Sequence, residues 1–471
     1  MKKYRRLIFY SVVVIGLTAL IFFVISRGTL LEKTGVKNVD TTGSKSLWQH
    51  FSATLQQNLL HPLPMLLLQV ITIILVARLF GWLCTKIGQT KVISEIIAGI
   101  ILGPSFLGSY FPELSGFLFP PASFSNLQFL SQIGLILFMF IVGMELDLQI
   151  LKTKAQDAVV ISHASIIFPF ALGITLSYFI YEKFAPAHVG FLGFSMFTGI
   201  AMSITAFPVL ARIVQERNLS KTRLGAIVIT CAAADDITAW CLLAVVIAIV
   251  KAGTLMSALF TILMAVAYVV VMIKLVQPFL KKIGASYTGK ETLSKSIIAI
   301  YFIVLILSAY LTEVIGIHAL FGAFMAGLMM PTDSNLRHVF TEKVEDVSMV
   351  LLLPLFFVYT GLRTQIGLLN DSYLWTVCGV IIAVAVTGKF VGSALAAKFV
   401  GQSWRDSLSI GALMNTRGLM ELIVLNIGYD LGVLNAEIFA MMVIMALVTT
   451  FMTSPILDLI NKFLPEKRSD G

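Results

Sequence analysis

Charged side chains are scarce in this sequence. Asp, Glu, Lys and Arg make up 13% of the 471 residues, hydrophobic residues make up 58%, and the mean hydropathy is +0.92. Soluble chains carry roughly 25% charged and 45–50% apolar residues, so soluble domains and a nucleic-acid-binding protein are excluded. One membrane span needs about 20 mostly apolar residues. The composition therefore predicts a polytopic membrane protein with about a dozen spans.

The sequence also lacks the spacings that bind metals or build disulfide frameworks. Its four cysteines form no Cys-x-x-Cys pair and lie in apolar segments, where we expect small buried hydrophobic side chains. They are Cys84, Cys231, Cys241 and Cys378. The six histidines include no His-Glu-x-x-His spacing. We therefore expect no cofactor, no bound metal and no enzyme.

Long apolar segments divide the rest of the chain. Residues 7–25 follow four basic residues, and we interpret them as an uncleaved anchor. Residues 27–63 are mixed and polar, which predicts a linker, so 1–63 form an anchor helix and linker. The remaining segments show no alternation of the barrel-strand kind, and they predict an all-α protein. Spans are expected at 64–86, 91–107, 127–145, 158–181, 188–215, 222–250, 254–276, 294–315, 317–331, 349–366, 372–399, 406–429 and 437–461.

The basic residues predict the orientation of these spans. With a cytoplasmic N-terminus, 24 of the 34 Lys and Arg residues fall on the cytoplasmic side and 7 on the other. Cytoplasmic loops carry an excess of positive charge. The distribution favours fourteen spans, both termini in the cytoplasm, and a multi-pass protein of the inner (plasma) membrane.

Three charged residues stand in the middle of predicted spans. A charge near the bilayer centre costs about 2.5 to 3.5 kcal/mol on insertion scales, and such residues commonly mark an ion or proton path. Asp235 and Asp236 are adjacent, and two neighbouring carboxylates repel, which argues against a purely structural role. Lys389, flanked by Gly388 and Gly392, is a candidate counter-ion. Its alternative, snorkelling to an interface, conflicts with its distance from either span end.

Two spans are interrupted by polar or helix-breaking residues. Residues 188–215 contain Ser203, Thr205 and Pro208, and residues 406–429 contain Asn415, Thr416, Arg417 and Glu421. Taken singly, these patterns also fit a proline kink and a cytosolic loop. Interrupted helices at matching places in two halves point instead to a midplane binding site. The i, i+4 spacing predicts that Arg417 pairs with Glu421.

The two halves of the chain match when the first six spans after the anchor are paired with the last six. The interrupted spans are then opposite each other and run in opposite directions, which predicts inverted repeats. The expected organisation is a first repeat at 64–251, a connector helix and cytosolic loop at 252–293, a second repeat at 294–463, and a short tail at 464–471.

Together these motifs resemble the monovalent cation/proton antiporter family. The similarity is closest to the branch of bacterial sodium/proton and potassium-efflux antiporters and plant cation/proton exchangers. The resemblance covers 64–463. It is carried by 94–104, 205–212, 234–236, 317–324, 388–389 and 415–422.

The resemblance implies a homodimer in membrane lipid, with a dimerisation domain and a mobile core built around two crossed, unwound helices. It makes Asp236 the carboxylate that binds cation or proton, with Asp235 paired to Lys389 and Thr205 beside the site. Asp235 departs from electroneutral relatives, which tend to carry Asn there. The short tail and the segment at 7–25 depart from the usual pattern as well.

We therefore expect an antiporter that exchanges Na⁺ for protons by alternating access, electrogenically because of the second carboxylate and Lys389. A K⁺/H⁺ antiporter is the main alternative, since nothing in the sequence separates Na⁺ from K⁺. A gated cation channel and an intramembrane aspartyl protease are the others. The protease needs carboxylates from two helices, whereas the mid-span pair is adjacent in sequence.

Overall fold

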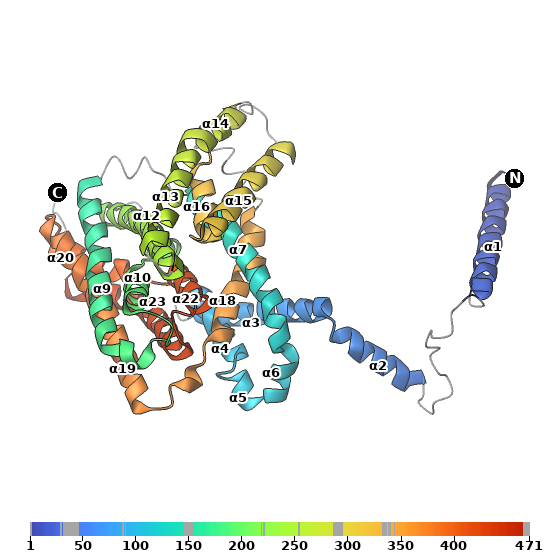
Figure 1. Cartoon of the computed structure of the whole chain (residues 1–471), viewed down its shortest axis with the longest axis horizontal. Helices are drawn as coiled ribbons and strands as arrows, with labels where there is room; N and C mark the ends of the chain where they lie inside the picture. The colour runs from blue at the N-terminus through green and yellow to red at the C-terminus, as the bar shows by residue number, and fades with distance from the viewer. Residues whose placement is uncertain are drawn as a thin grey trace. The chain divides into compact units, whose positions relative to one another are not determined.

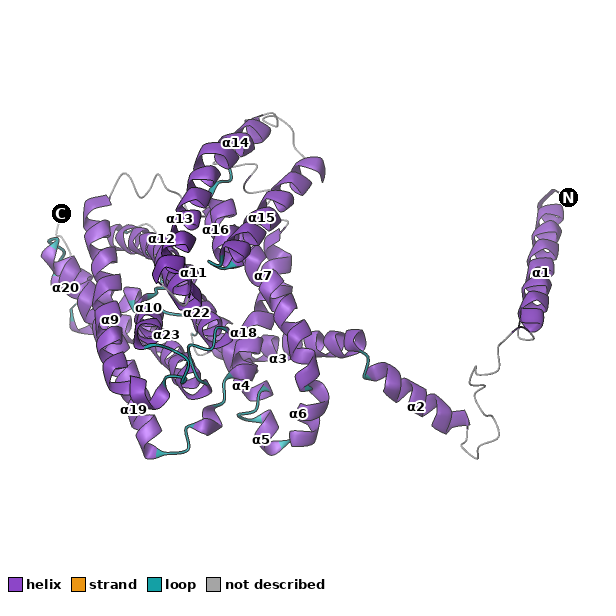
Figure 2. Cartoon of the chain, in the orientation of Figure 1, coloured by secondary structure: helices purple, strands orange, loops and turns teal. Residues whose placement is uncertain are grey.

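The computed structural model describes residues 2–28, 31, 47–86, 89, 91–145, 155–217, 219, 222–252, 255–285, 295–331, 337, 341–342 and 344–464. Two compact units divide the chain, Met1–His61 and Pro62–Gly471. The described residues are helical or lie in loops, with no strand among them (Figure 2).

The first unit contains two described helices. α1 (Lys2–Gly28) includes the predicted anchor, and Phe9–Gly28 is long and apolar enough to cross a membrane. α2 (Leu47–Leu59) lies where we expected a linker. The prediction was wrong for this segment because Leu47, Phe51, Leu55 and Leu59 recur every four residues, the spacing of one helix face.

The second unit is a bundle of helices (Figure 1). Its α-helices are α3 (Pro62–Lys86), α4 (Lys91–Leu102), α5 (Leu107–Tyr110), α6 (Pro112–Leu118), α7 (Phe124–Glu145), α9 (Ala155–Phe184), α10 (Phe191–Ser203), α11 (Phe207–Glu216), α12 (Arg223–Ala252), α13 (Leu255–Val271), α14 (Gln277–Ala285), α15 (Lys295–Ile315), α16 (Ala319–Leu328), α18 (Leu353–Arg363), α19 (Ser372–Val386), α20 (Gly392–Phe399), α21 (Trp404–Met414), α22 (Leu419–Asp430) and α23 (Ala436–Phe463). Short 3₁₀ turns are η2 (Pro121–Ser123) and η5 (Ile366–Leu368). Longer π-helical turns are η3 (Met272–Val276), η4 (Val347–Leu352) and η6 (Thr387–Val391).

The described helices confirm an all-α, multi-pass membrane protein. Twelve are long and apolar enough to span a bilayer, or thirteen when the bent pair α21 and α22 is counted as one span. The predicted span 317–331 differs, because α16 has only 10 residues and so a length of about 15 Å. The chain turns just before it, where Gly316 and His318 have φ values of 97° and 82°, and Pro331 follows its C-terminal end.

The helices of the second unit pack in two groups. In the first, which we call the α7–α18 group, α18 packs against α4 and α7, α3 packs against α4, and α16 packs against α7 and α15. In the second, the α9–α23 group, α9 packs against α10, α12 and α20, and α21 and α22 both pack against α23. The charged residues singled out in the sequence lie in the second group.

Three of the four cysteines are buried, as expected. Cys84, Cys231 and Cys378 are buried free thiols, but Cys241 is exposed at the surface of α12. The prediction that all four are buried was wrong there, because an apolar span presents part of its circumference to lipid and an apolar segment alone does not say which part.

Candidate functional site at the crossing of two broken helices

The first interrupted span is broken beside its proline. α10 ends at Ser203 and α11 begins at Phe207, with extended backbone over 204–206. Pro208 lies in the first turn of α11, where a missing backbone N–H is tolerated. Pro208 therefore starts the second half-helix and does not kink a continuous one.

The second interrupted span is broken at its polar motif. α21 ends at Met414, α22 begins at Leu419, and the pair is bent by 41°. Gly418, with φ 151° and ψ −125°, is the residue that leads into α22. This backbone conformation is open essentially only to glycine, so Gly418 sets the direction in which the second half-helix leaves the break.

The two breaks cross each other. The backbone N–H of Ala206 donates to the carbonyl of Thr416 over 3.1 Å, and the Thr205 hydroxyl lies 3.2 Å from the carbonyl oxygen of Met414. Two buried threonines of α23 support the second break, since Thr450 donates to the carbonyl of Arg417 and Thr453 contacts the Thr416 hydroxyl. The predicted pair of crossed, broken helices is confirmed.

Side chains from the second half of the sequence donate hydrogen bonds to the backbone carbonyls at the C-terminal end of α10. Arg417, fully buried, donates to the carbonyls of Ala201 at 2.9 Å and Met202 at 2.6 Å. Lys389 donates to the carbonyl of Ser203. The last carbonyls of a helix lack partners within it and carry its partial negative charge, so these two cations stabilise the broken end.

Arg417 also meets the acidic residue predicted for it. Its Nη1 lies 3.2 Å from Oε1 of Glu421, and both side chains are fully buried. Glu421 stands in the first turn of α22, where the helix dipole favours a negative charge. The i, i+4 ion pair is therefore confirmed.

Asp235 is surrounded by donors. Its Oδ1 accepts from Ser162 at 2.6 Å, and its Oδ2 accepts from Ser165 at 2.5 Å, Thr205 at 2.8 Å and Lys389 at 3.1 Å. All of these side chains are buried. The Asp235–Lys389 pair is confirmed, and the carboxylate is held by three hydroxyls besides the ammonium group.

Lys389 reaches this position from the π-helical turn η6. Its Nζ also contacts the Ser165 carbonyl at 2.9 Å and hydroxyl at 3.1 Å. The turn packs tightly on α9, because a Cβ on Gly388 would lie 2.8 Å from the Cα of Pro169 and one on Gly392 would lie 2.8 Å from Cβ of Phe168. The predicted close approach at these two glycines is confirmed.

Asp236 has opposite surroundings. It is completely buried, and neither carboxylate oxygen bonds a side chain among the described residues; the polar group beside them is the backbone N–H of Phe207 at the start of α11. Asn415, in the second break, is likewise buried with its side-chain amide unpartnered in the described part of the chain. A buried carboxylate without a partner is costly unless it takes a proton or a cation. The two breaks thus surround three buried carboxylates: Asp235 is hydrogen-bonded, Glu421 is paired with Arg417, and Asp236 is in no ion pair among the described residues.

Sequence reasoning missed two of the residues that hold Asp235. Ser162 and Ser165 lie on α9, about 70 residues before the carboxylate. Their i, i+3 spacing puts them on one helix face, but serine in a helix often bonds its own backbone, as Ser177 of α9 does. The signal was therefore too weak to separate a ligand-holding serine from an ordinary one.

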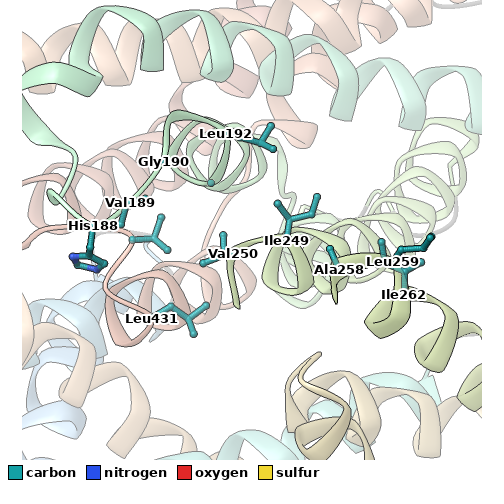
Figure 3. A pocket seen from close by; sticks show the side chains of 12 residues that line it. His188, Val189, Gly190, Leu192, Ile249, Val250, Ala258, Leu259, Ile262 and Leu431 are labelled. Carbon is teal, nitrogen blue, oxygen red and sulfur yellow. The ribbon is translucent and has the colours of Figure 1, made fainter. Parts of the chain in front are cut away.

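A pocket away from the crossing lies elsewhere in the second unit. It has a volume of ≈ 590 Å³ and is lined mainly by apolar side chains from α10, α12 and α13 and by the turn after α22 (Figure 3). His188 is the one ionisable residue among those lining it, and no predicted site residue reaches it. It is therefore separate from the crossing of the broken helices.

Discontinuous helices that cross in the membrane beside buried carboxylates define a class of protein, the secondary transporters. This chain belongs to the sodium/hydrogen exchanger family. The family model described as "Sodium/hydrogen exchanger, transmembrane" matches residues 71–459, which include both breaks and all three mid-span charges. The family is one of transporters.

Three similar proteins of known name are named as antiporters. The chain is 47% identical over 393 residues to the Na⁺/H⁺ antiporter NhaS4 of Synechocystis, covering 83% of this chain and 96% of the relative. It is 40% identical to cation/H⁺ antiporter 17 of Arabidopsis thaliana and 34% identical to K⁺/H⁺ antiporter 1 of Saccharomyces cerevisiae, over 85% and 87% of this chain. It spans about half the length of those two proteins, 49% and 47%.

The fold is shared with a solved structure. The sodium proton antiporter MjNhaP1 of Methanocaldococcus jannaschii at pH 8 superposes with a TM-score of 0.62 at 14% sequence identity. The match covers 86% of this chain and 100% of that one.

Proposed function

We propose that this protein is a secondary antiporter that exchanges Na⁺ for protons, with Asp236 as the group that binds both. The observation that carries the proposal is the contrast at the crossing. Asp235 is fully satisfied, whereas Asp236 is buried without a side-chain partner among the described residues. The 47% identical relative is named as a Na⁺/H⁺ antiporter, which supports Na⁺ as the cation.

Competition for one carboxylate couples the two flows. Asp236 holds either a dehydrated cation or a proton, and the bare charge is too costly to carry past an apolar barrier. Only the two loaded forms cross, so a cation moves one way only when a proton moves the other way. The apparent affinity for the cation therefore falls as the pH falls, because protons then occupy Asp236.

A K⁺/H⁺ antiporter is the second candidate. The 34% identical yeast relative is named as a K⁺/H⁺ antiporter, and cation choice depends on site geometry more than on the carboxylate itself. Purified protein in proteoliposomes, driven by a pH gradient, separates the candidates when Na⁺, K⁺ and Li⁺ are compared at several pH values. Uphill cation movement driven by the pH gradient also excludes a passive channel.

Replacing Asp236 by Asn tests the site in the same vesicles. Asp236→Asn removes the titrating charge with little change in shape, and we expect exchange to be lost. The matched control is Asp458→Asn, since Asp458 is exposed at the surface of α23 and pairs with Arg217, where an ion pair contributes little. Persistent exchange in Asp236→Asn would remove Asp236 from the mechanism.

The arrangement in the membrane belongs to the same proposal. We place both termini in the cytoplasm of the inner (plasma) membrane, with 64–251 and 294–463 as inverted repeats and a homodimer as the assembly. Reporter fusions at each terminus test the orientation. Native mass spectrometry of the detergent-solubilised protein tests whether the 51.6 kDa chain is found as a pair.

A further inference from the structure

A second charged cluster lies at the far end of α22 from the crossing. It joins Arg363, the last residue of α18, to Asp430, the last residue of α22. We call Arg363, Asp430 and Asn426 the terminal cluster. Its two helices belong to different packing groups, since α18 packs against α4 and α7, and α22 packs against α10 and α23.

The contacts within the terminal cluster are strong ones. Arg363 Nη2 lies 2.5 Å from Oδ1 of Asp430, and Arg363 Nη1 donates to Oδ1 of Asn426 at 3.2 Å. The guanidinium also lies over the ring of Tyr429, 4.5 Å from its centroid. The side chains are only 16% and 33% exposed, so water screens the pair less than it screens an open surface pair. Charge-assisted bonds of this length are about twice as strong as neutral ones.

Two further contacts tie α22 to the α7–α18 group. The Asn426 amide donates to the Thr360 hydroxyl of α18 at 2.8 Å, and the Gln128 amide of α7 donates to Oδ2 of Asp430 at 3.3 Å. A small, partly open cavity lies between α7, α16, α18 and α22 beside these contacts, with Ile423, Asn426 and Asp430 on its wall.

The terminal cluster is mechanically connected to the crossing. α22 is one continuous helix from its first turn, where Glu421 pairs with Arg417, to Asp430. The two ends are about 13 Å apart along the helix. A shift of the whole of α22 along or away from α18 therefore separates Asp430 and Asn426 from Arg363 and Thr360.

We propose that the terminal cluster is a gate at the end of the bundle where α18 and α22 terminate. The Arg363–Asp430 pair holds α22 against α18 and closes the passage between this end and Ile423. The pair breaks each time the site opens toward this end of the bundle. This inference rests on the proposed antiport function. It assigns to Arg363 and Asp430 a positioning role, since they act through the placement of α22 and not by contact with the transported ion.

Accessibility of one buried position tests the gate. Ile423→Cys, in a background in which the four native cysteines are replaced, puts a thiol on the cavity wall where Ile423 is 1% exposed. We expect slow reaction with a membrane-impermeant thiol reagent. Adding Asp430→Asn or Arg363→Gln is expected to raise the labelling rate at least about tenfold, as loss of a hydrogen bond between charged groups implies.

The matched control weakens an ion pair of the same kind elsewhere. Arg217→Gln removes the pair with Asp458 and should leave labelling of the cysteine at position 423 unchanged. Swapping the charges, Arg363→Asp with Asp430→Arg, should return labelling toward the slow rate. An unchanged rate in both single variants, or a fast rate that the swap does not lower, would overturn the gate.

A reversible cross-link tests whether the gate must open. Thr360→Cys with Asn426→Cys, joined by a short bifunctional thiol reagent, is expected to stop exchange, and reduction is expected to restore it. Gln69→Cys with Ser123→Cys is the matched control, because these side chains are bonded at 2.7 Å within the α7–α18 group, and its cross-link should leave exchange running. Exchange that continues with positions 360 and 426 linked contradicts the gate. Failure of the antiport proposal is distinguished by Asp236→Asn, which does not involve these residues.

Discussion

Asp235 and Asp236 are neighbours in the sequence and have different partners. Successive residues of a helix point about 100° apart, so Asp235 faces Lys389, Ser162 and Ser165 while Asp236 faces a place without a side-chain partner among the described residues. One carboxylate is fixed by the protein, and in the proposed mechanism the other binds the ligand. This division explains why two adjacent carboxylates are useful here although they repel each other.

At the residue scale, Ser165 is expected to matter because it contacts both members of the ion pair. Ser165→Ala removes a hydrogen bond to a charged group, worth about 1.5 to 3 kcal/mol, and we expect exchange to slow roughly tenfold. Ser177→Ala on the same helix is the matched control, since Ser177 is equally buried but bonds only its own helix. Equal rates in the two variants would show that Ser165 does not position Asp235.

The ion pair itself makes a prediction about stability. Lys389→Met leaves Asp235 charged and without its cation in a fully buried place, and breaking a buried pair in this way costs about 3 to 5 kcal/mol. We expect a clear fall in the melting temperature of the detergent-solubilised protein. The double variant Asp235→Asn with Lys389→Met should recover most of it, because no charge is then left unpaired. A double variant as unstable as the single one would contradict this account.

At the scale of elements, two of the half-helix ends at the breaks are stabilised by charged side chains. Arg417 and Lys389 satisfy the carbonyls at the end of α10, and Glu421 stands at the start of α22. These groups replace the hydrogen bonds that a continuous helix would have made. Broken helices inside a bilayer are tolerated only where such partners or other protein surround them.

Gly418 is the element-scale position most sensitive to substitution. Gly418→Ala places a Cβ where φ is 151°, which costs roughly 1 to 3 kcal/mol, so we expect lower thermal stability and slower exchange. Gly379→Ala on α19 is the control, because a Cβ there meets nothing within 4 Å and alanine favours a helix. Both variants are compared by thermal melting and by vesicle exchange. A tolerated Gly418→Ala would mean that α22 has another way to leave the break.

At the scale of the whole molecule, the two packing groups share one apolar core, in which Trp240 of α12 stacks on Phe324 of α16, and α22 carries both the crossing and the terminal cluster. A movement of the α9–α23 group against α18 therefore changes the surroundings of Asp236 and the Arg363–Asp430 pair together. We therefore expect one displacement both to change access to Asp236 and to break the Arg363–Asp430 pair.

The second carboxylate predicts that exchange responds to voltage. If the Asp235–Lys389 pair also exchanges a proton in each cycle, more than one proton moves per cation, and the exchange rate should then change when a potential is imposed across the vesicle membrane with a selective ionophore. The variant Asp235→Asn with Lys389→Met should retain Asp236 and lose this response. A wild-type rate indifferent to the potential would exclude the electrogenic scheme.

Much of the fold was predictable because membrane spans leave a strong local signal. Apolar segments of sufficient length gave the spans, and Pro208 and the 415–418 motif marked the breaks. The exceptions depend on the length of a helix or on which of its faces is exposed. They are the ten-residue α16, the helix at Leu47–Leu59 and the exposed Cys241. Hydropathy is an average over a segment, so it reports neither property.

The sequence by itself determined the class of protein, the mid-span charges and the pairing of Arg417 with Glu421, because each depends on composition or on spacing along one helix. The family resemblance already implied that Asp235 pairs with Lys389. Only the tertiary structure decided that Ser162 and Ser165 hold Asp235 and that Arg363 meets Asp430. These contacts join residues about 70 positions apart. Their geometry arises from how broken helices cross and pack, which no local pattern records.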